Sequence, residues 1–218
     1  MDKIFPMKIT ERLVNTVKPI WDKMLSHRFL EEVGRGTITS AAFQNWLVQD
    51  YLFVREALRF LGALILRSPQ IEISLVLVDS LGALKRELSM FEGYARERSF
   101  SLDAEPSKIC SAYTDFLVAS AISKSFEEAF AVLWCAEKAY LDSWMTVKRL
   151  ANNQNPYLIF IDNWTGNAMR SYVTWLQETL ERLTTGKQER EITAIENSFV
   201  LAANYELMFW DTAYEGKP

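Results

Sequence analysis

Histidine, cysteine, proline and glycine are scarce in this sequence of 218 residues, which has one His, two Cys, six Pro and eight Gly. A di-metal site in a helical bundle uses Glu-x-x-His pairs on facing helices, and the single His27 cannot supply them. His27 alone is also a poor axial ligand for a haem, so we expect neither a metal site nor a cofactor. Cys110 and Cys135 do not make the disulfide framework of a small secreted protein.

Other features are missing as well. No apolar run reaches the roughly 18 residues of a membrane span, and the start of the chain lacks the apolar segment of a signal peptide. The sequence has no Gly-rich phosphate loop, no Ser/His/Asp set and no C-x-x-C pair. Its net charge of −4 gives no basic stripe for a nucleic acid. We therefore expect a cytoplasmic protein that binds neither membranes nor nucleic acids.

Aromatic residues are abundant, with thirteen Phe and seven Trp. Apolar side chains recur at the helical period through most of the sequence, and no segment shows a convincing period of two. The sequence therefore predicts an all-α fold, a helical bundle in which residues 1–218 form a single domain. The predicted helices cover residues 9–26 (broken or kinked at Pro19), 40–67 (capped by Ser40), 71–98, 106–123, 126–148, 157–183 and 187–213, with a turn at residues 27–30.

Three acidic residues, Asp50, Glu137 and Glu206, lie on apolar faces of three predicted helices. Burying an ionised acid without a partner costs several kcal/mol, so such an acid pairs, takes up a proton or lines a wet pocket. A single buried acid is most often a salt-bridged structural residue. The cationic residues at helical spacing from these acids mostly point outward, as Arg55, Arg59 and Lys138 do. We therefore expect the three helices to converge on one polar cavity, which Tyr51, Tyr113 and Tyr140 could line.

Carboxylic acids in an aromatic cavity suit acid/base chemistry on a flat, nitrogen-rich ring. Burial raises the pKa of an acid toward neutral pH, and a carboxyl group can hydrogen-bond an exocyclic amine or a ring nitrogen. Cys135 lies about 200° around its helix from Glu137, so these two side chains cannot share one direction. Which of them faces the cavity is left open by the sequence.

Several motifs, taken in order, resemble the TenA (thiaminase II) family. The resemblance covers nearly the whole chain, and the motifs are jointly specific although each alone is weak. It implies a heme-oxygenase-like helical fold and a homo-oligomer, a tetramer or a dimer. The motifs are WLVQDYLF at residues 46–53, HRFL at 27–30 with GT at 36–37, AYTDFL at 112–117, WCAEKAY at 134–140 and ELMFW at 206–210.

The resemblance implies hydrolysis of an aminopyrimidine at its aminomethyl carbon, in thiamin salvage. Family members with a nucleophilic Cys place it four residues before a Tyr, where this sequence has Ala136 before Tyr140. Glu137 instead resembles the branch that lacks this Cys, which is associated with aminomethyl- and formylaminomethyl-pyrimidines. Two positions depart from the family pattern, since Phe53 and Ile161 stand where many members have Tyr.

The resemblance also suggests roles for the candidate residues. Asp50 is expected to hold the amino group and ring nitrogen of the pyrimidine, and Glu206 to transfer protons to and from the ring. Glu137 is expected to activate water or the leaving amine. Tyr113, Tyr140 and Tyr51 are substrate-binding candidates, with Phe53 and Trp164 as stacking walls.

Three alternatives remain at this point. Cys135 could be the nucleophile of a thiaminase II. The chain could bind a pyrimidine without turnover, as a regulator. A cofactor-free oxidase of the related pyrroloquinoline-quinone synthase type is less expected, because its substrate would need several basic and His residues.

Overall fold

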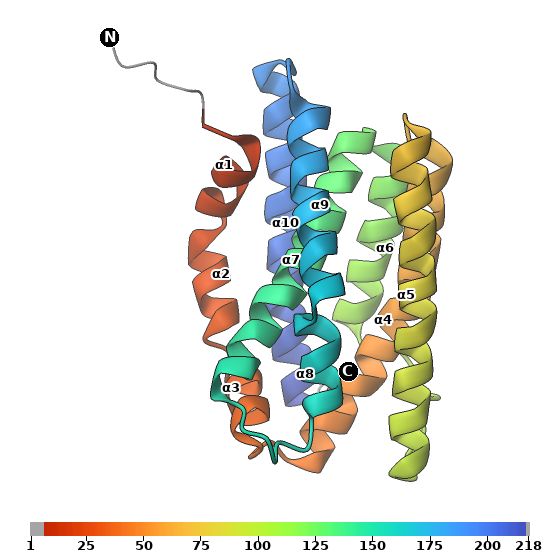
Figure 1. Cartoon of the computed structure of the whole chain (residues 1–218), viewed down its shortest axis with the longest axis vertical. Coiled ribbons are helices and arrows are strands. Elements are labelled where there is room, and N and C mark those ends of the chain that lie inside the picture. The colour runs from red at the N-terminus through yellow and green to blue at the C-terminus, as the bar shows by residue number, and fades with distance from the viewer. Residues whose placement is uncertain (1–6, 217–218) are drawn as a thin grey trace.

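A computed structural model describes residues 7–216, which form ten α-helices and contain no β-strand (Figure 1). The all-α prediction is thus confirmed. Helices α1 and α2 lie along one side of the molecule and α5 along the opposite side (Figure 1). The helices are α1 (Ile9–Thr16), α2 (Lys18–Leu25), α3 (Arg28–Arg35), α4 (Ser40–Arg67), α5 (Ile71–Glu97), α6 (Lys108–Ser123), α7 (Phe126–Leu150), α8 (Leu158–Thr165), α9 (Asn167–Thr184) and α10 (Glu189–Glu215).

The N-terminal part differs from the prediction in one place. The predicted break near Pro19 is confirmed, because α1 ends before Val17 and Pro19 lies in the first turn of α2. A proline is tolerated there since the missing N–H has no intrahelical partner in a first turn. The predicted turn at residues 27–30 is wrong, because α3 begins at Arg28. His27 is its N-cap, and its Nδ1 accepts a hydrogen bond from the Phe29 backbone N–H at 3.1 Å.

Helix α4 begins at Ser40 as expected, but Ser40 is not its cap. The hydroxyl of Thr39 accepts a hydrogen bond from the Ala42 backbone N–H at 3.2 Å, so Thr39 is the N-cap and Ser40 the first helical residue.

The predicted helix over residues 157–183 is two helices, α8 and α9. They are separated by Gly166, whose backbone is extended with φ −70° and ψ 168°. A Cβ atom at this position would lie 2.9 Å from the Asp162 carbonyl oxygen, so the bend needs a glycine. Arg170 Nε donates to the Thr165 carbonyl at 2.9 Å and satisfies an acceptor that the break leaves free.

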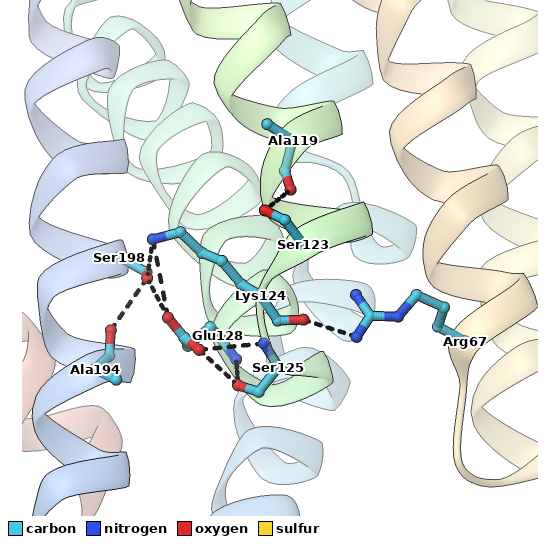
Figure 2. Close-up of polar contacts among 8 residues, drawn as sticks. All are labelled: Arg67, Ala119, Ser123, Lys124, Ser125, Glu128, Ala194 and Ser198. Atoms are coloured by element: carbon cyan, nitrogen blue, oxygen red, sulfur yellow. Dashed lines mark hydrogen bonds and ion pairs between the residues drawn. The ribbon is translucent and has the colours of Figure 1, made fainter.

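Helix α7 lies at the centre of the bundle and packs against α10, α3, α9, α8 and α6. Its first turn is a capping box in which Ser125 Oγ accepts from the Glu128 N–H at 3.2 Å and Glu128 Oε2 accepts from the Ser125 N–H at 3.1 Å (Figure 2). Ser198 on α10 donates to Glu128 Oε1 at 3.1 Å and accepts from Lys124 at 2.9 Å. Arg67 at the end of α4 donates to the Lys124 carbonyl at 2.7 Å. These contacts fix the start of α7 relative to α4 and α10.

Aromatic side chains fill the core between these helices. Trp46 on α4, Trp144 on α7 and Trp210 on α10 are all fully buried, and Phe160 on α8 packs edge-on against Trp46. The buried apolar residues form one continuous cluster. Within residues 7–216 no helix is long and apolar enough to cross a membrane.

Candidate active site

Asp50 on α4 is fully buried and is linked to α7 by one hydrogen bond. The Tyr140 hydroxyl donates to Asp50 Oδ1, while Oδ2 has no partner in the part of the chain that the structure describes. Burial raises the pKa of Asp50 to about 7, against the lowering effect of the Tyr140 hydrogen bond. Asp50 can therefore gain or lose a proton near neutral pH, and it keeps one oxygen for a ligand.

Glu206 on α10 repeats this arrangement with a tyrosine from α6. The Tyr113 hydroxyl donates to Glu206 Oε1 at 2.5 Å, and Oε2 has no partner among residues 7–216. Burial raises the pKa of Glu206 to about 8, the Tyr113 hydrogen bond opposes the rise, and repulsion from Asp50 and Glu137 adds to it. The charges of Asp50 and Glu137 thus act on Glu206, and their convergence on one cavity stays a prediction.

Glu137 on α7 has a different environment, because it makes no hydrogen bond to another side chain of the described residues. Burial raises its pKa to about 7, yet its side chain is half-buried rather than fully buried. The charge of Glu137 also raises the pKa of Glu206, so these two carboxyl groups on α7 and α10 interact.

The nearby cations do not neutralise these acids. Arg59 pairs with Glu56 at 2.6 Å, and Lys138 pairs with Asp142 at 2.8 Å. Arg55 is exposed and lies over the ring of Tyr51, 5.8 Å from its centroid. Within residues 7–216, no ion pair involves Asp50, Glu137 or Glu206. The site therefore has acidic groups without basic ones.

Aromatic rings border the acids on two sides. Phe53 packs against Tyr113 with 5.0 Å between ring centroids, and Trp164 packs edge-on against Tyr140 at 5.7 Å. Their role as stacking walls stays a prediction. Tyr51 is placed elsewhere, because its hydroxyl donates to Glu92 at 3.2 Å on an exposed surface. It follows Asp50 directly, so the helix turns it about 100° away from the cavity, and we remove it from the site.

Sequence reasoning missed a fourth acid, Glu87 on α5. The pKa of Glu87 is well above its usual range because of burial and then because of repulsion from Asp50 and Glu137, while a hydrogen bond from Trp164 opposes the rise. Glu87 lies three residues after Leu84 and four before Phe91, on the apolar stripe of its helix. The signal that identified the other acids was therefore present here too.

Tyr172 on α9 was also missed. Burial raises the pKa of Tyr172, the charge of Glu137 adds to the rise, and a contact with Ser80 on α5 opposes it. A tyrosine from α9 thus lies between Glu137 and α5. The nearness of Tyr172 to Glu137 and Ser80 could not be predicted, because these three residues are far apart in the sequence.

Cys135 is a fully buried thiol whose Sγ donates to the Phe199 carbonyl on α10 at 3.7 Å. Burial and the nearby Glu206 raise the pKa of Cys135 well above its usual range. Since the thiolate is the nucleophilic form, this environment disfavours Cys135 as a nucleophile.

His27 lies away from the acids, with Nε2 3.2 Å from Asp211 Oδ1 and Nδ1 capping α3. No group of three His, Cys, Asp or Glu side chains within residues 7–216 is arranged to hold a metal ion. A surface hollow of about 500 Å³ lies at a different place, between the start of α4, the loop before α6 and the end of α10. None of the four acids lines it.

Comparison with known proteins shows the family of this chain. The model of the TENA/THI-4/PQQC family matches residues 14–216. An aminopyrimidine aminohydrolase from Helicobacter pylori is 24% identical over 216 residues, which are 96% of this chain and 100% of that protein. The X-ray structure of a TenA homologue from Pyrococcus furiosus is 34% identical with a TM-score of 0.91, covering 94% of this chain and 100% of that one.

A domain from Shewanella denitrificans with a heme oxygenase-like fold gives a TM-score of 0.76 at 12% identity, covering 97% of this chain and 94% of that one. This likeness shows the fold, which is the heme-oxygenase-like bundle implied by the sequence motifs. Since the family model matches nearly the whole sequence, the chain belongs to the TENA/THI-4/PQQC family.

Proposed function

We propose that this protein is an aminopyrimidine hydrolase of thiamin salvage, which converts an aminomethyl- or formylaminomethyl-pyrimidine to the hydroxymethyl-pyrimidine. The name of the Helicobacter pylori relative supports this reaction, since the similarity covers nearly both chains. The chemistry of the site supports it independently, because the three acids lie near aromatic rings and, within the described residues, none of them is paired with a Lys or Arg side chain.

The observation that carries the proposal is the pair of half-satisfied carboxyl groups. Asp50 and Glu206 are each held by one tyrosine hydroxyl, and each has a buried oxygen with no partner in residues 7–216. An unpaired buried polar atom costs free energy unless a ligand or water satisfies it. The exocyclic amine and ring nitrogens of an aminopyrimidine offer the donors and acceptors that these two oxygens need.

Each acid has a role in the proposed reaction. Asp50 binds the exocyclic amine and a ring nitrogen, and Glu206 gives a proton to the ring and takes it back, which its pKa near 8 allows. Glu137 accepts a proton from water as the water oxygen attacks the aminomethyl carbon. The carbon–oxygen bond forms, and the carbon–nitrogen bond of the protonated aminomethyl group breaks with its electron pair going to nitrogen, so that neutral ammonia leaves.

The tyrosines and the aromatic walls orient the substrate. Tyr140 and Tyr113 hold one oxygen of Asp50 and of Glu206, so the other oxygen points in a fixed direction. In this proposal Phe53 and Trp164, which contact Tyr113 and Tyr140, stack on the faces of the flat ring. Phe53 has no hydroxyl and Ile161 has no ring, so we expect weaker recognition of a large leaving group than in members with tyrosines there.

Ammonia release tests the proposal. Purified protein is incubated with aminomethyl-pyrimidine, and ammonia and hydroxymethyl-pyrimidine are measured together. Equimolar formation of both supports the hydrolase. Binding of the pyrimidine without product formation would instead indicate a non-catalytic pyrimidine-binding protein. A side-by-side panel with formylaminomethyl-pyrimidine and thiamin then ranks the substrates.

We further propose that the protein is a cytoplasmic homo-oligomer, a tetramer or a dimer. Ile71, Leu75 and Val78 recur at helical spacing on α5, and each side chain is about half or more exposed, which is unusual for large apolar residues. A second copy of the chain would bury this stripe. Cys110 and Cys135 are free thiols, which suits a reducing compartment. Light scattering of the purified protein measures its mass and tests the assembly.

A further inference from the structure

Tyr205 is an aromatic residue next to Glu206 on α10 that the proposed mechanism does not use. Its ring stacks almost parallel on the ring of Tyr113 from α6, with 5.2 Å between the centroids and 4° between the planes. This is an offset stack, one of the arrangements that aromatic pairs prefer. The Tyr113 ring therefore packs on Tyr205, while the Tyr113 hydroxyl donates to Glu206 Oε1 at 2.5 Å.

Tyr205 also packs against a second ring of α6. Phe116, one turn after Tyr113, stacks on Tyr205 with 5.3 Å between the centroids and 29° between the planes. Tyr205 is only partly buried, whereas Tyr113 and Glu206 are each 1% exposed. The stack thus joins a partly exposed ring to the buried hydrogen bond between α6 and α10.

The contacts of Tyr205 involve its ring and not its hydroxyl, which makes no hydrogen bond within residues 7–216. The hydroxyl oxygen of a tyrosine lies on the long axis of the ring, so a tilt of the Tyr113 ring moves its hydroxyl relative to Glu206. A ring that lies flat against Tyr113 opposes a tilt toward its own side. Phe53 also contacts Tyr113, but with 41° between the planes it does not lie flat against that ring.

We propose that Tyr205 is a positioning residue for the reaction, which acts on Glu206 through the ring and hydroxyl of Tyr113. This inference rests on the proposed function, in which Glu206 transfers protons to and from the pyrimidine ring. Without the stacked ring Tyr113 tilts more freely, the hydrogen bond loosens and the Glu206 carboxyl group takes a wider range of directions. Proton transfer then becomes slower, because it depends on the orientation of the transferring group, while Asp50 still binds the substrate.

Steady-state ammonia release from aminomethyl-pyrimidine tests the ring against the hydroxyl. Tyr205→Leu removes the stacked ring, so kcat should fall about fivefold, the effect of one lost aromatic pair, and KM should change less than about twofold. Tyr205→Phe keeps the ring and should retain the wild-type kcat within about twofold. Tyr214→Leu is the matched control and should change neither parameter, since Tyr214 is another partly buried tyrosine of α10 that packs against His27.

A double-mutant cycle shows whether Tyr205 acts through Tyr113. Tyr113→Phe removes the hydroxyl that holds Glu206, and adding Tyr205→Leu to it should lower kcat further by less than about twofold. An equal fall in both backgrounds would overturn the proposal, because Tyr205 would then act independently of this hydrogen bond. Wild-type kcat in Tyr205→Leu, or an equal loss in Tyr205→Phe, would also overturn it. Circular dichroism verifies folding, and Tyr205→Met replaces Tyr205→Leu in the cycle if the leucine variant does not fold.

A second readout needs no substrate. Burial raises the pKa of Glu206, the Tyr113 hydrogen bond lowers it, and the charges of Asp50 and Glu137 raise it further. Infrared spectra recorded across pH follow the protonated carboxyl band that is absent from Glu206→Gln protein. Tyr205→Leu should move the midpoint of this band to higher pH, and Tyr205→Phe should leave it in place.

The two readouts separate this inference from the proposed function. An unmoved midpoint in Tyr205→Leu would overturn the role of Tyr205 even in a protein that releases ammonia. Absence of ammonia release from the wild-type protein would overturn the proposed function, and the infrared midpoint would still decide whether Tyr205 acts on Glu206.

Discussion

At the scale of single residues, the site depends on carboxyl groups that are only half satisfied. A tyrosine hydroxyl holds one oxygen of Asp50 and one of Glu206, and the second oxygen of each remains free within the described chain. Burial keeps the pKa of both acids near 7 or 8. Both properties are needed, since the tyrosine fixes direction and the raised pKa allows proton transfer near neutral pH.

Replacing Glu206 by Gln keeps the shape of the side chain but removes its titratable proton. We expect the turnover of aminomethyl-pyrimidine to fall at least about a hundredfold. Steady-state rates of ammonia release measure this, with Glu189→Gln on the same helix as a control because the Glu189 side chain is 71% exposed. Turnover equal to that of the wild type would remove Glu206 from the mechanism.

Replacing Cys135 by Ser distinguishes the acid mechanism from a thiol nucleophile. The serine hydroxyl can still donate to the Phe199 carbonyl, so the fold should tolerate the change. Since burial keeps the Cys135 thiol protonated, we expect activity within about threefold of the wild type. An inactive but folded variant would restore the thiaminase II alternative, and the same ammonia assay decides.

Asp50, Glu137 and Glu206 could be predicted as candidates because an acid on an apolar helix face is conspicuous at any one position. Glu87 meets the same criterion and was nevertheless missed. Tyr51 follows Asp50 directly in the sequence, yet its hydroxyl donates to Glu92 and not to one of the three acids. Two adjacent residues of a helix point about 100° apart, so a shared sequence motif does not put both side chains in one site.

At the scale of helices, a break between two helices was predictable only where the sequence has a helix-breaking proline. Pro19 marks the break between α1 and α2, whereas Gly166 separates α8 and α9 within an uninterrupted apolar pattern. The missed helix α3 begins with His27 as its cap, a residue type that is not a common N-cap. The boundary at Gly166 depends on its extended backbone and on the close Asp162 carbonyl four residues earlier, which the apolar pattern does not indicate.

The break at Gly166 gives a stability prediction. An alanine there would place its Cβ 2.9 Å from a backbone oxygen, so the α8–α9 junction must shift. We expect Gly166→Ala to lower the free energy of unfolding by about 1–3 kcal/mol, as overpacking does. Gly62→Ala is the matched control, since Gly62 lies within α4 with nothing within 4 Å of its Cβ direction, and alanine favours helix. Denaturant unfolding of both variants compares them, and equal stability would contradict the structural account.

At the scale of the whole molecule, the buried acids should make stability depend on pH. Asp50, Glu137 and Glu206 have their pKa raised to about 7, 7 and 8. The folded protein therefore binds more protons than the unfolded chain between about pH 4 and pH 8, and the free energy of unfolding falls as pH rises through this range. Each unit of pKa shift corresponds to about 1.4 kcal/mol.

We expect the Tm to fall between about pH 5 and pH 8, and to fall less steeply in Glu206→Gln, which has one such acid fewer. Differential scanning fluorimetry across this range measures both slopes. Identical slopes for the two proteins would show that Glu206 is not buried as an acid of raised pKa.

The bundle itself was predictable because aromatic and aliphatic residues recur at the helical period through most of the chain, and one apolar cluster joins the described helices. The ordered motifs predicted the heme-oxygenase-like fold. The nearness of Glu87 on α5 and Tyr172 on α9 to the predicted acids was not predictable, because these two residues belong to none of the motifs. Their proximity results from packing, which only the folded chain defines.

A crystal structure of the protein soaked with hydroxymethyl-pyrimidine tests the central claim most directly, because it shows where an aromatic guest binds. We predict the ring between Phe53 and Trp164, with the free oxygens of Asp50 and Glu206 at hydrogen-bond distance from its nitrogens. The hydroxymethyl group should point toward Glu137. A ring bound elsewhere, or these acids closed against each other with no guest between them at saturating ligand, would contradict the account.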